Sequence, residues 1–140
     1  MRQILFRGKD LSGVLDHSWI FGSLDTTEKE YPSIIYLDRF GNRCRISVNH
    51  KTVGQYTGLT DKNGKKIFEG DIVRLYGDEN NPDTKMIDYN ALVIFKKGRF
   101  CAIDGTEDNH SFERLIFNSY LNCEVIGNKY DNPELLEAQE

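Results

Sequence analysis

The chain has 140 residues and a formal net charge of −4, and 39% of its residues are hydrophobic, including eight Phe, seven Tyr and one Trp. A chain of this length buries one core or two small adjoining cores, and the aromatic side chains supply much of the apolar area. No apolar run approaches the roughly 20 residues of a membrane-spanning helix, so we expect neither a membrane span nor a secretion signal.

The cysteines and the distribution of charge indicate the kind of compartment and the kinds of partner that suit this protein. Cys44, Cys101 and Cys123 are odd in number and widely spaced, which argues against a disulfide framework and fits a reducing compartment. Residues 1–50 carry seven basic and six acidic side chains, whereas residues 51–140 carry eleven basic and sixteen acidic ones. Because non-specific binding to nucleic acid depends on Lys and Arg, the acidic total leaves only a local basic patch for that role.

The first 50 residues show the pattern of antiparallel β-structure, with short apolar or aromatic segments between Gly, Asn and Asp. Strands are predicted at Gln3–Arg7, Ser18–Leu24, Ile34–Leu37 and Arg43–Val48. In the last of these segments apolar and polar residues alternate, so one face of that strand is expected to be buried. A hairpin turn is predicted at Arg39–Asn42.

The second part of the chain continues the β pattern. Asn63-Gly64, between Leu59 and Ile67, predicts a tight type I′ hairpin turn. Further strands are predicted at Ile72–Tyr76, Ala91–Lys96, Phe100–Asp104 and Asn122–Gly127, with an exposed, mobile loop at Gly77–Thr84. The segment His110–Leu121 fits a short helix or a strand at Arg114–Phe117, and we favour the helix. Asn132-Pro133-Glu134 predicts a short helix from Pro133 to about Glu137.

One long segment resembles a known family. The stretch VGQYTGLTDKNGKKIFEGDIVRL, Val53–Leu75, is similar to the YopX family of phage and prophage proteins, and Ile4–Asp10, Trp19–Gly22 and Glu124–Glu137 support the match. The resemblance implies a mainly β fold, with a β-rich N-terminal part at residues 1–50, an SH3-like barrel at 51–131 and a short helical tail at 132–140. It implies no established biochemical activity.

The residues that carry this resemblance also have plain structural roles, which we favour. Glycines at 58, 64, 70 and 127 suit turns or close backbone approach, and Asp61 and Asp71 can accept hydrogen bonds from nearby backbone amides. A calcium loop at Asp61 is not supported, because Lys65 stands where a ligand is needed and the following glutamate comes too early.

The search for reactive groups finds no enzyme signature. No pair among the three cysteines and three histidines has the close spacing that structural zinc sites usually show. Neither a nucleophile-elbow motif nor a phosphate-binding glycine loop is present. We therefore predict a protein that is not an enzyme, with no catalytic residues, no metal and no cofactor.

Basic hairpin tips are the main candidate interaction residues, namely Lys62, Lys65 and Lys66 on one hairpin and Lys96, Lys97 and Arg99 on another. Together with aromatic residues such as Tyr56, Phe68, Tyr76 and Phe100 they suit contacts with nucleic acid. The alternative, which we favour, is that the lysines keep strand edges soluble and the aromatic residues lie in the core.

Trp19, Leu135 and Leu136 complete the candidate set. Tryptophan is frequent both in cores and at protein contacts, and the two leucines must pack on their own domain or on a second subunit. We expect a non-catalytic phage or prophage protein in the cytoplasm of the bacterial host, which forms homo-oligomers and contacts host or phage proteins. The alternative is a nucleic-acid-binding module.

Overall fold

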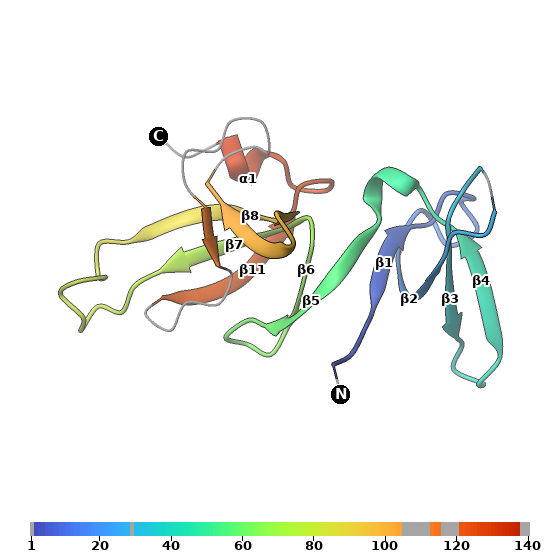
Figure 1. The fold of residues 1–140 in the computed structure, drawn as a ribbon, viewed down its shortest axis with the longest axis horizontal. Helices are drawn as coiled ribbons and strands as arrows, with labels where there is room; N and C mark the ends of the chain where they lie inside the picture. Colours follow the sequence, from blue (N-terminus) through green and yellow to red (C-terminus); the bar gives the residue numbers. More distant parts are fainter. Residues whose placement is uncertain (1, 29, 105–112, 116–120, 138–140) are drawn as a thin grey trace. The chain divides into compact units, whose positions relative to one another are not determined.

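The computed structural model describes residues 2–28, 30–104, 113–115 and 121–137, and it is mainly β, with two antiparallel sheets and one four-residue helix in these ranges. The chain divides into two compact units, Met1–Gly58 and Leu59–Glu140 (Figure 1). The domain boundaries that were expected at residues 50 and 131 remain predictions. Within the described ranges, no helix has the length and hydrophobicity to cross a membrane.

The first unit is built from successive antiparallel strands. They are β1 (Phe6–Lys9), β2 (Trp19–Asp25), β3 (Ser33–Leu37), β4 (Arg43–Ser47) and β5 (Gly54–Thr60), which follows the 3-10 turn η1 (His50–Thr52). The sheet order is β4-β3-β2-β1-β5-β6, where β6 (Lys66–Phe68) already belongs to the second unit. Alternation along these strands buries Ile20, Ile34 and Val48 as a small core.

The end of β4 also bonds to the end of β1, although β2 and β3 separate these strands in the sheet order. Asp10 and Val48 form an antiparallel bridge. On either side of it the Leu11 N–H donates to the Ser47 carbonyl and the Asn49 N–H donates to the Lys9 carbonyl, both at 2.9 Å. The sheet therefore curls back on itself, which shields part of the outer edge of β4.

The second unit is a five-stranded sheet in the order β10-β9-β8-β7-β11. Its strands are β7 (Asp71–Tyr76), β8 (Asp88–Lys96), β9 (Arg99–Ile103), β10 (Glu113–Leu115) and β11 (Asn122–Asn128). Among the described residues no pairing joins β10 to β11. The SH3-like barrel expected at residues 51–131 is thus not confirmed and stays a prediction.

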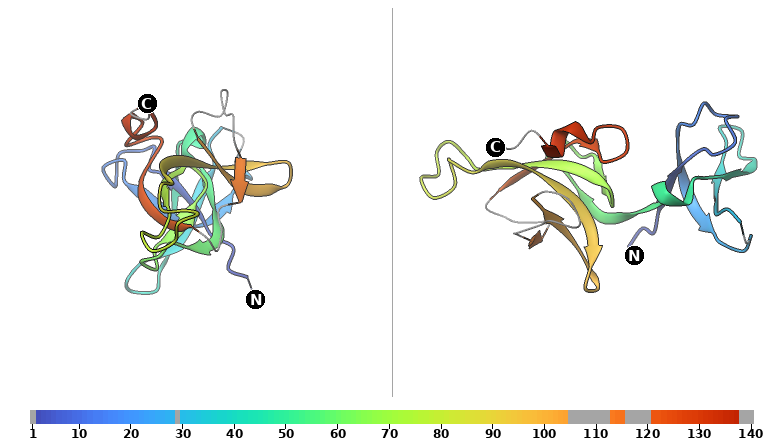
Figure 2. Two further views of the ribbon diagram at one scale, coloured as in Figure 1. Left: turned by 90° about the vertical axis from the view of Figure 1, so that its left-hand side faces the viewer. Right: turned by 90° about the horizontal axis from the view of Figure 1, so that it is seen from above.

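Both faces of this sheet are buried, which explains the nearly continuous apolar run in β8. One face packs Val73, Leu75 and Val93 against Ile67 of β6. The other face is covered in part by the helix α1 (Glu134–Glu137), as the views in Figure 2 show.

The hairpin predicted at Asn63-Gly64 is confirmed, but its type I′ turn is wrong. Only Gly64 has a positive φ, of 81°, and its N–H donates to the Asp61 carbonyl at 3.0 Å, so the turn is wider. The Asp61 side chain stabilises this wider turn by accepting the N–H groups of Asn63 and Lys65. The pair of positive φ values that a type I′ turn requires occurs instead at Lys97-Gly98, with 53° and 78°.

Two other segments differ from expectation. The helix predicted over His110–Leu121 is wrong at Glu113–Leu115, which pairs with β9 as a strand, and most of the rest lies outside the described residues. The segment Gly77–Thr84 is exposed over much of its length, yet it is built from hydrogen-bonded turns and ends at a buried threonine.

Candidate functional site

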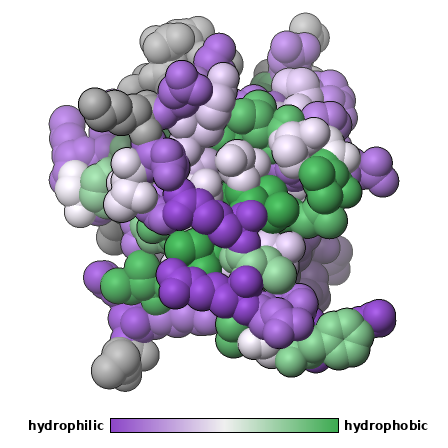
Figure 3. Space-filling view, turned by 90° about the vertical axis from the view of Figure 1, so that its right-hand side faces the viewer, coloured by the Kyte–Doolittle hydropathy of each residue, from purple (hydrophilic) through white to green (hydrophobic). Residues whose placement is uncertain are grey.

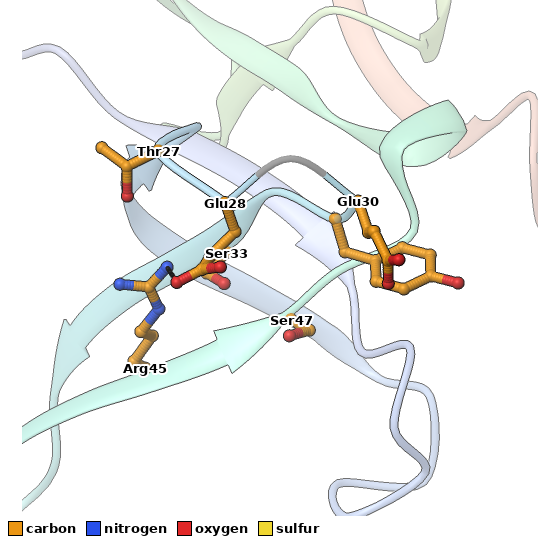
Figure 4. A pocket seen from close by; sticks show the side chains of 7 residues that line it. Thr27, Glu28, Glu30, Ser33, Arg45 and Ser47 are labelled. Carbon is orange, nitrogen blue, oxygen red and sulfur yellow. Dashed lines mark ion pairs between the residues drawn. The ribbon is translucent and has the colours of Figure 1, made fainter.

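A polar depression of about 650 Å³ lies on the first unit, between β3, β4 and the loop that joins β2 to β3 (Figure 4). Its lining residues carry hydroxyl, carboxylate and guanidinium groups, and they are Thr27, Glu28, Glu30, Tyr31, Ser33, Arg45 and Ser47. Its mixed polar lining distinguishes it from a typical apolar ligand pocket.

Two serines face one another across the strands at this site. Ser33 of β3 and Ser47 of β4 are cross-strand partners, and their small side chains leave room above the sheet. Ser33 is only 2% exposed. Its side chain nevertheless lines the depression.

The loop above the serines is anchored by Asp25, the last residue of β2. Its carboxylate accepts the Thr27 hydroxyl at 2.7 Å and the Thr27 N–H at 2.9 Å, and it pairs with the Arg45 guanidinium at 2.7 Å. These contacts, the Thr27 hydroxyl foremost, hold the pKa of Asp25 below its ordinary value. Asp25 is therefore ionised at neutral pH. It holds the beginning of the β2–β3 loop through Thr27, and it holds the Arg45 side chain through the ion pair.

The charged side chains among the described lining residues are Glu28, Glu30 and Arg45. Arg45 lies 2.7 Å from Asp25 and 3.8 Å from Glu28, and Figure 4 shows the latter ion pair. Glu30 has no ion pair or hydrogen bond among the described side chains, which do not include Lys29. Asp25, which pairs with Arg45, is not itself a lining residue.

Trp19, a candidate from the sequence, lies elsewhere on this sheet. The Arg7 guanidinium is 4.4 Å from the centroid of its ring and the Lys9 ammonium is 5.4 Å away. Lys9 and Trp19 are direct cross-strand partners. The half-buried ring is thus a contact surface for two cations of its own chain.

The two basic hairpin tips are not joined by strand pairing. Lys62, Lys65 and Lys66 lie on the β5–β6 hairpin, and Lys96, Lys97 and Arg99 lie on the β8–β9 hairpin, which belongs to the other sheet. Apart from the half-buried Lys96, all of these side chains are exposed.

Around Lys62 the structure adds a cluster that the sequence did not reveal. The Lys62 ammonium contacts the Tyr76 hydroxyl, and this hydrogen bond raises the pKa of Lys62. The Arg74 guanidinium lies 4.2 Å from the same ring and forms two hydrogen bonds with Asp88, at 2.9 and 2.8 Å. Arg74 and Asp88 are 14 residues apart in the sequence and meet only because β7 pairs with β8. No local sequence pattern therefore marks them as partners.

The remaining candidates lie in or near the core. Tyr56 and Phe68 are buried, as the structural interpretation predicted, and Phe100 makes an edge contact with Phe95 at 5.0 Å. Leu135 and Leu136 pack with Ile126 against the core of their own unit. The tail therefore has an apolar partner within its own chain.

Metal-ligating side chains do not converge anywhere in the ranges described. No group of three or more His, Cys, Asp or Glu residues there is placed to hold a metal ion. The described residues that line the depression offer hydroxyl, carboxylate and guanidinium groups for hydrogen bonds and ion pairs.

The comparison with protein families decides the assignment, since the model for the YopX protein family matches residues 15–137. The chain belongs to the YopX family. The crystal structure of yopX from Bacillus subtilis is 21% identical, with a TM-score of 0.61, and the match covers 96% of this chain and 98% of that one. EF1440 from Enterococcus faecalis is 23% identical, with a TM-score of 0.51, and the match covers 97% and 99%.

These two structures show that the YopX fold extends over nearly the whole chain, and at this level of identity they show the fold alone. No curated protein sequence matches the chain. The family assignment made from Val53–Leu75 is confirmed, and the activity has to be argued from the residues themselves.

Proposed function

We propose that this YopX-family chain is a non-catalytic protein-interaction module of a phage or prophage, which acts in the bacterial cytoplasm and assembles with copies of itself. The observation that carries the proposal is the open depression on the first unit, because its described lining residues offer hydrogen-bonding and charged groups without a reactive arrangement. Its surroundings also carry exposed apolar side chains.

The absence of a catalytic role is supported by the chemistry of the lining. Among the described lining residues, no histidine or lysine is present to act as a base for the hydroxyls of Ser33 and Ser47. Asp25, whose pKa is lowered, is ionised at neutral pH and has no proton to donate. These hydroxyl and carboxylate groups are therefore better suited to binding a partner than to catalysing a reaction.

Apolar residues near the depression support contact with another protein. Alternation along the strands places Phe21 and Leu37 on the same face as Ser33 and Arg45. Figure 3 shows hydrophobic patches set between hydrophilic side chains on this side of the molecule. At the β3–β4 turn Phe40 is 74% exposed, in a mixture of aromatic and basic groups that is typical of protein interfaces.

The β3–β4 turn is also held in a fixed shape. Asp38 accepts the N–H groups of Phe40 and Asn42 at 2.9 and 2.8 Å, and the Arg39 guanidinium lies 4.8 Å from the Phe40 ring. A rigid aromatic anchor loses little conformational entropy when a partner binds.

Light scattering at micromolar concentration tests self-assembly. We expect a mass above that of the monomer for the wild type and a monomer for the double variant Leu37→Asp with Phe40→Asp. Met86→Asp, at an exposed position of the second unit, is the matched control and is expected to keep the wild-type mass. A monomeric wild type contradicts self-assembly.

The second candidate function, binding of single-stranded nucleic acid, is favoured by one observation: Lys62 and Arg74 lie against Tyr76. A closed SH3-like barrel in the second unit belongs to this proposal, because small barrels combine basic and aromatic groups at such surfaces. Oligonucleotide binding that weakens with salt and is lost in Lys62→Gln supports it, while no binding at low ionic strength contradicts it.

A further inference from the structure

We infer that the free edge of β4 binds an extended acidic segment of a partner protein, which joins the first sheet as a further antiparallel strand. This inference rests on the proposed function, because it takes the partner to be a protein. It adds the place at which the partner binds and the chemistry that the partner carries, and its evidence comes from the backbone groups and the charges of β4.

The backbone of β4 has hydrogen-bonding groups on the side away from β3. β4 is the last strand on its side of the sheet (Figure 1). The Val48 N–H donates to the Pro32 carbonyl of the β3 side at 2.9 Å, so alternation turns the backbone groups of Arg43 and Arg45 to the other side. In the part of the chain that the structure describes, no strand pairs with that side of residues 43–46. This stretch is therefore an edge to which another strand can bond.

Both ends of this edge are fixed within the chain. At one end the Leu11 N–H donates to the Ser47 carbonyl at 2.9 Å and closes the edge. At the other end Asp38 accepts the N–H groups of Phe40 and Asn42, at 2.9 and 2.8 Å, and holds the turn before β4. The open stretch between them, residues 43–46, spans about 13 Å at roughly 3.3 Å per residue. A short edge that is already in place loses little conformational entropy when a partner strand binds.

The outer face of this edge favours an acidic partner. Arg43 and Arg45 lie on that face, and the Arg45 guanidinium is already paired with Asp25 at 2.7 Å. Arg43 is exposed, and within the described ranges its side chain forms no ion pair or hydrogen bond. A carboxylate directly opposite Arg43 on an added strand gives this guanidinium a charge-assisted partner. The bound segment is therefore expected to carry Asp or Glu at that position.

The inner face of the same edge favours apolar neighbours for that acidic residue. Cys44 and Ile46 point inward between the arginines and are half-buried, and Ile46 packs against the small core of the first unit. Successive residues of an added strand also point to opposite faces, so those next to the acidic residue lie beside Cys44 and Ile46. Apolar side chains at these positions extend the core. The segment that fits β4 thus alternates acidic and apolar residues.

The arginines argue against a second copy of β4 on this edge. When the β4 strands of two copies pair antiparallel around Cys44, Arg43 of each lies opposite Arg45 of the other, and like charges directly opposite destabilise a sheet. When the strands pair around either arginine, that arginine faces its own counterpart. Nucleic acid lacks the alternating N–H and C=O groups to which an edge strand bonds. An acidic peptide segment therefore fits this edge best.

NMR titration of the ¹⁵N-labelled full chain with the peptide acetyl-EVEVE-amide tests the edge. We expect amide shifts at residues 43–47 and binding that weakens as salt is added. Acetyl-QVQVQ-amide, which lacks the charges, is expected to bind roughly fivefold more weakly, as for the loss of an exposed ion pair. The EVEVE peptide with N-methylated glutamates keeps its charge but cannot donate to the edge, and it is expected not to bind. Equal binding of the EVEVE peptide and either control peptide overturns the inference.

A charge reversal on β4 identifies the group that selects the partner. Arg43→Glu, with its fold checked by the amide spectrum, is expected to lose binding of acetyl-EVEVE-amide and to gain binding of acetyl-KVKVK-amide. Lys65→Glu makes the same charge change at an exposed position of the second unit and is expected to bind both peptides as the wild type does. Binding of the acidic peptide that is unchanged in Arg43→Glu overturns the inference.

Other occupants of the edge have their own signatures. If the amides of residues 43–47 shift when the wild type is diluted without peptide, a second copy covers the edge and the inference is overturned. It is also overturned if these amides respond to oligothymidylate and not to the acidic peptide.

The outcomes separate this inference from the proposed function. If the acidic peptide binds at β4 and the wild type is monomeric, the edge site stands and self-assembly fails. If the peptide does not bind but the Leu37→Asp with Phe40→Asp variant loses the oligomer, the interaction module stands and the edge site fails.

Discussion

The Asp61 carboxylate accepts a hydrogen bond from the Val125 N–H at 2.9 Å, across 64 residues of sequence. Its other oxygen accepts the N–H groups of Asn63 and Lys65, both at 2.9 Å. One nearly buried side chain therefore closes the β5–β6 turn and fastens it to β11.

Replacement of Asp61 by Asn is expected to destabilise the second unit by about 2 kcal/mol, because the new NH₂ group meets N–H donors in place of an acceptor. Urea unfolding followed by circular dichroism measures this loss. Asp78→Asn, an exposed aspartate in the same unit, is the control and is expected to change stability by less than about 0.5 kcal/mol.

The contribution of Asp61 also depends on pH. Burial opposes ionisation, but the N–H groups of Val125, Lys65 and Asn63 outweigh it and lower the pKa of Asp61. Because the folded-state pKa is lowered, the stabilisation is complete above the unfolded value of about 4 and is lost as the pH falls through the folded value. The stability difference between wild type and Asp61→Asn should shrink only below about pH 4. A difference that stays constant into acid would contradict this.

The thiol of Cys123 is expected to be unreactive. Burial, with added effects of Asp61 and Asp71, raises its pKa from 9.0 to about 11. At pH 8 the thiolate fraction is then about 100-fold lower than for an unperturbed thiol. Alkylation by iodoacetamide in a variant that keeps only Cys123 should be slow in the folded protein and fast in urea. Equal rates in both states would refute the prediction.

Gly77 is needed because of a close backbone approach. A Cβ at this position would overlap the Thr84 carbonyl, at the point where the β7–β8 loop closes. Gly77→Ala is expected to lower the unfolding free energy by about 3 kcal/mol. Gly98→Ala has a φ of 78° but open space around the new methyl group, so it should cost only about 1 kcal/mol. Thermal unfolding of the two variants compares them, and equal losses would rule out the overlap as the cause.

The tail leucines are expected to stabilise their own unit. Leu135→Ala and Leu136→Ala should each cost about 1–2 kcal/mol, since both side chains are half-buried against the second core. The exposed Glu137→Ala serves as the control. Light scattering of the double leucine variant distinguishes the roles: a lost oligomer, with the unit still folded, would show that the leucines contact a second subunit.

The positions of the strands can be predicted from local sequence patterns, whereas the pairing between strands cannot. Alternation marked Arg43–Val48 as a half-buried strand, and β4 covers all but its last residue. At Asn63-Gly64 the sequence placed the hairpin but missed the turn type, because the Asp61 side chain competes for the turn amides. The helix favoured near residue 114 failed because pairing with β9 overrides a weak helical pattern.

The depression was not predicted, for a related reason. Its lining comes from a loop and two strands, and only the register that sets Ser33 opposite Ser47 brings them together. The one local signal is Asp25-Thr26-Thr27, which is a common start for a side-chain-capped turn. That signal predicts a turn, but it does not indicate that Ser33 and Ser47 lie next to this turn in the folded chain.

The bridge between Asp10 and Val48 bears on how fragments of this protein should be cut. The matched family region begins at residue 15, and a fragment trimmed to it would lack β1, which hydrogen-bonds to β2 on one side and to β5 on the other. Such a fragment would also lack the carboxylate of Asp10, which accepts the N–H group of Leu15 at 2.7 Å. Expression trials should therefore keep the residues ahead of the matched region, since a shortened chain exposes two strand edges at once.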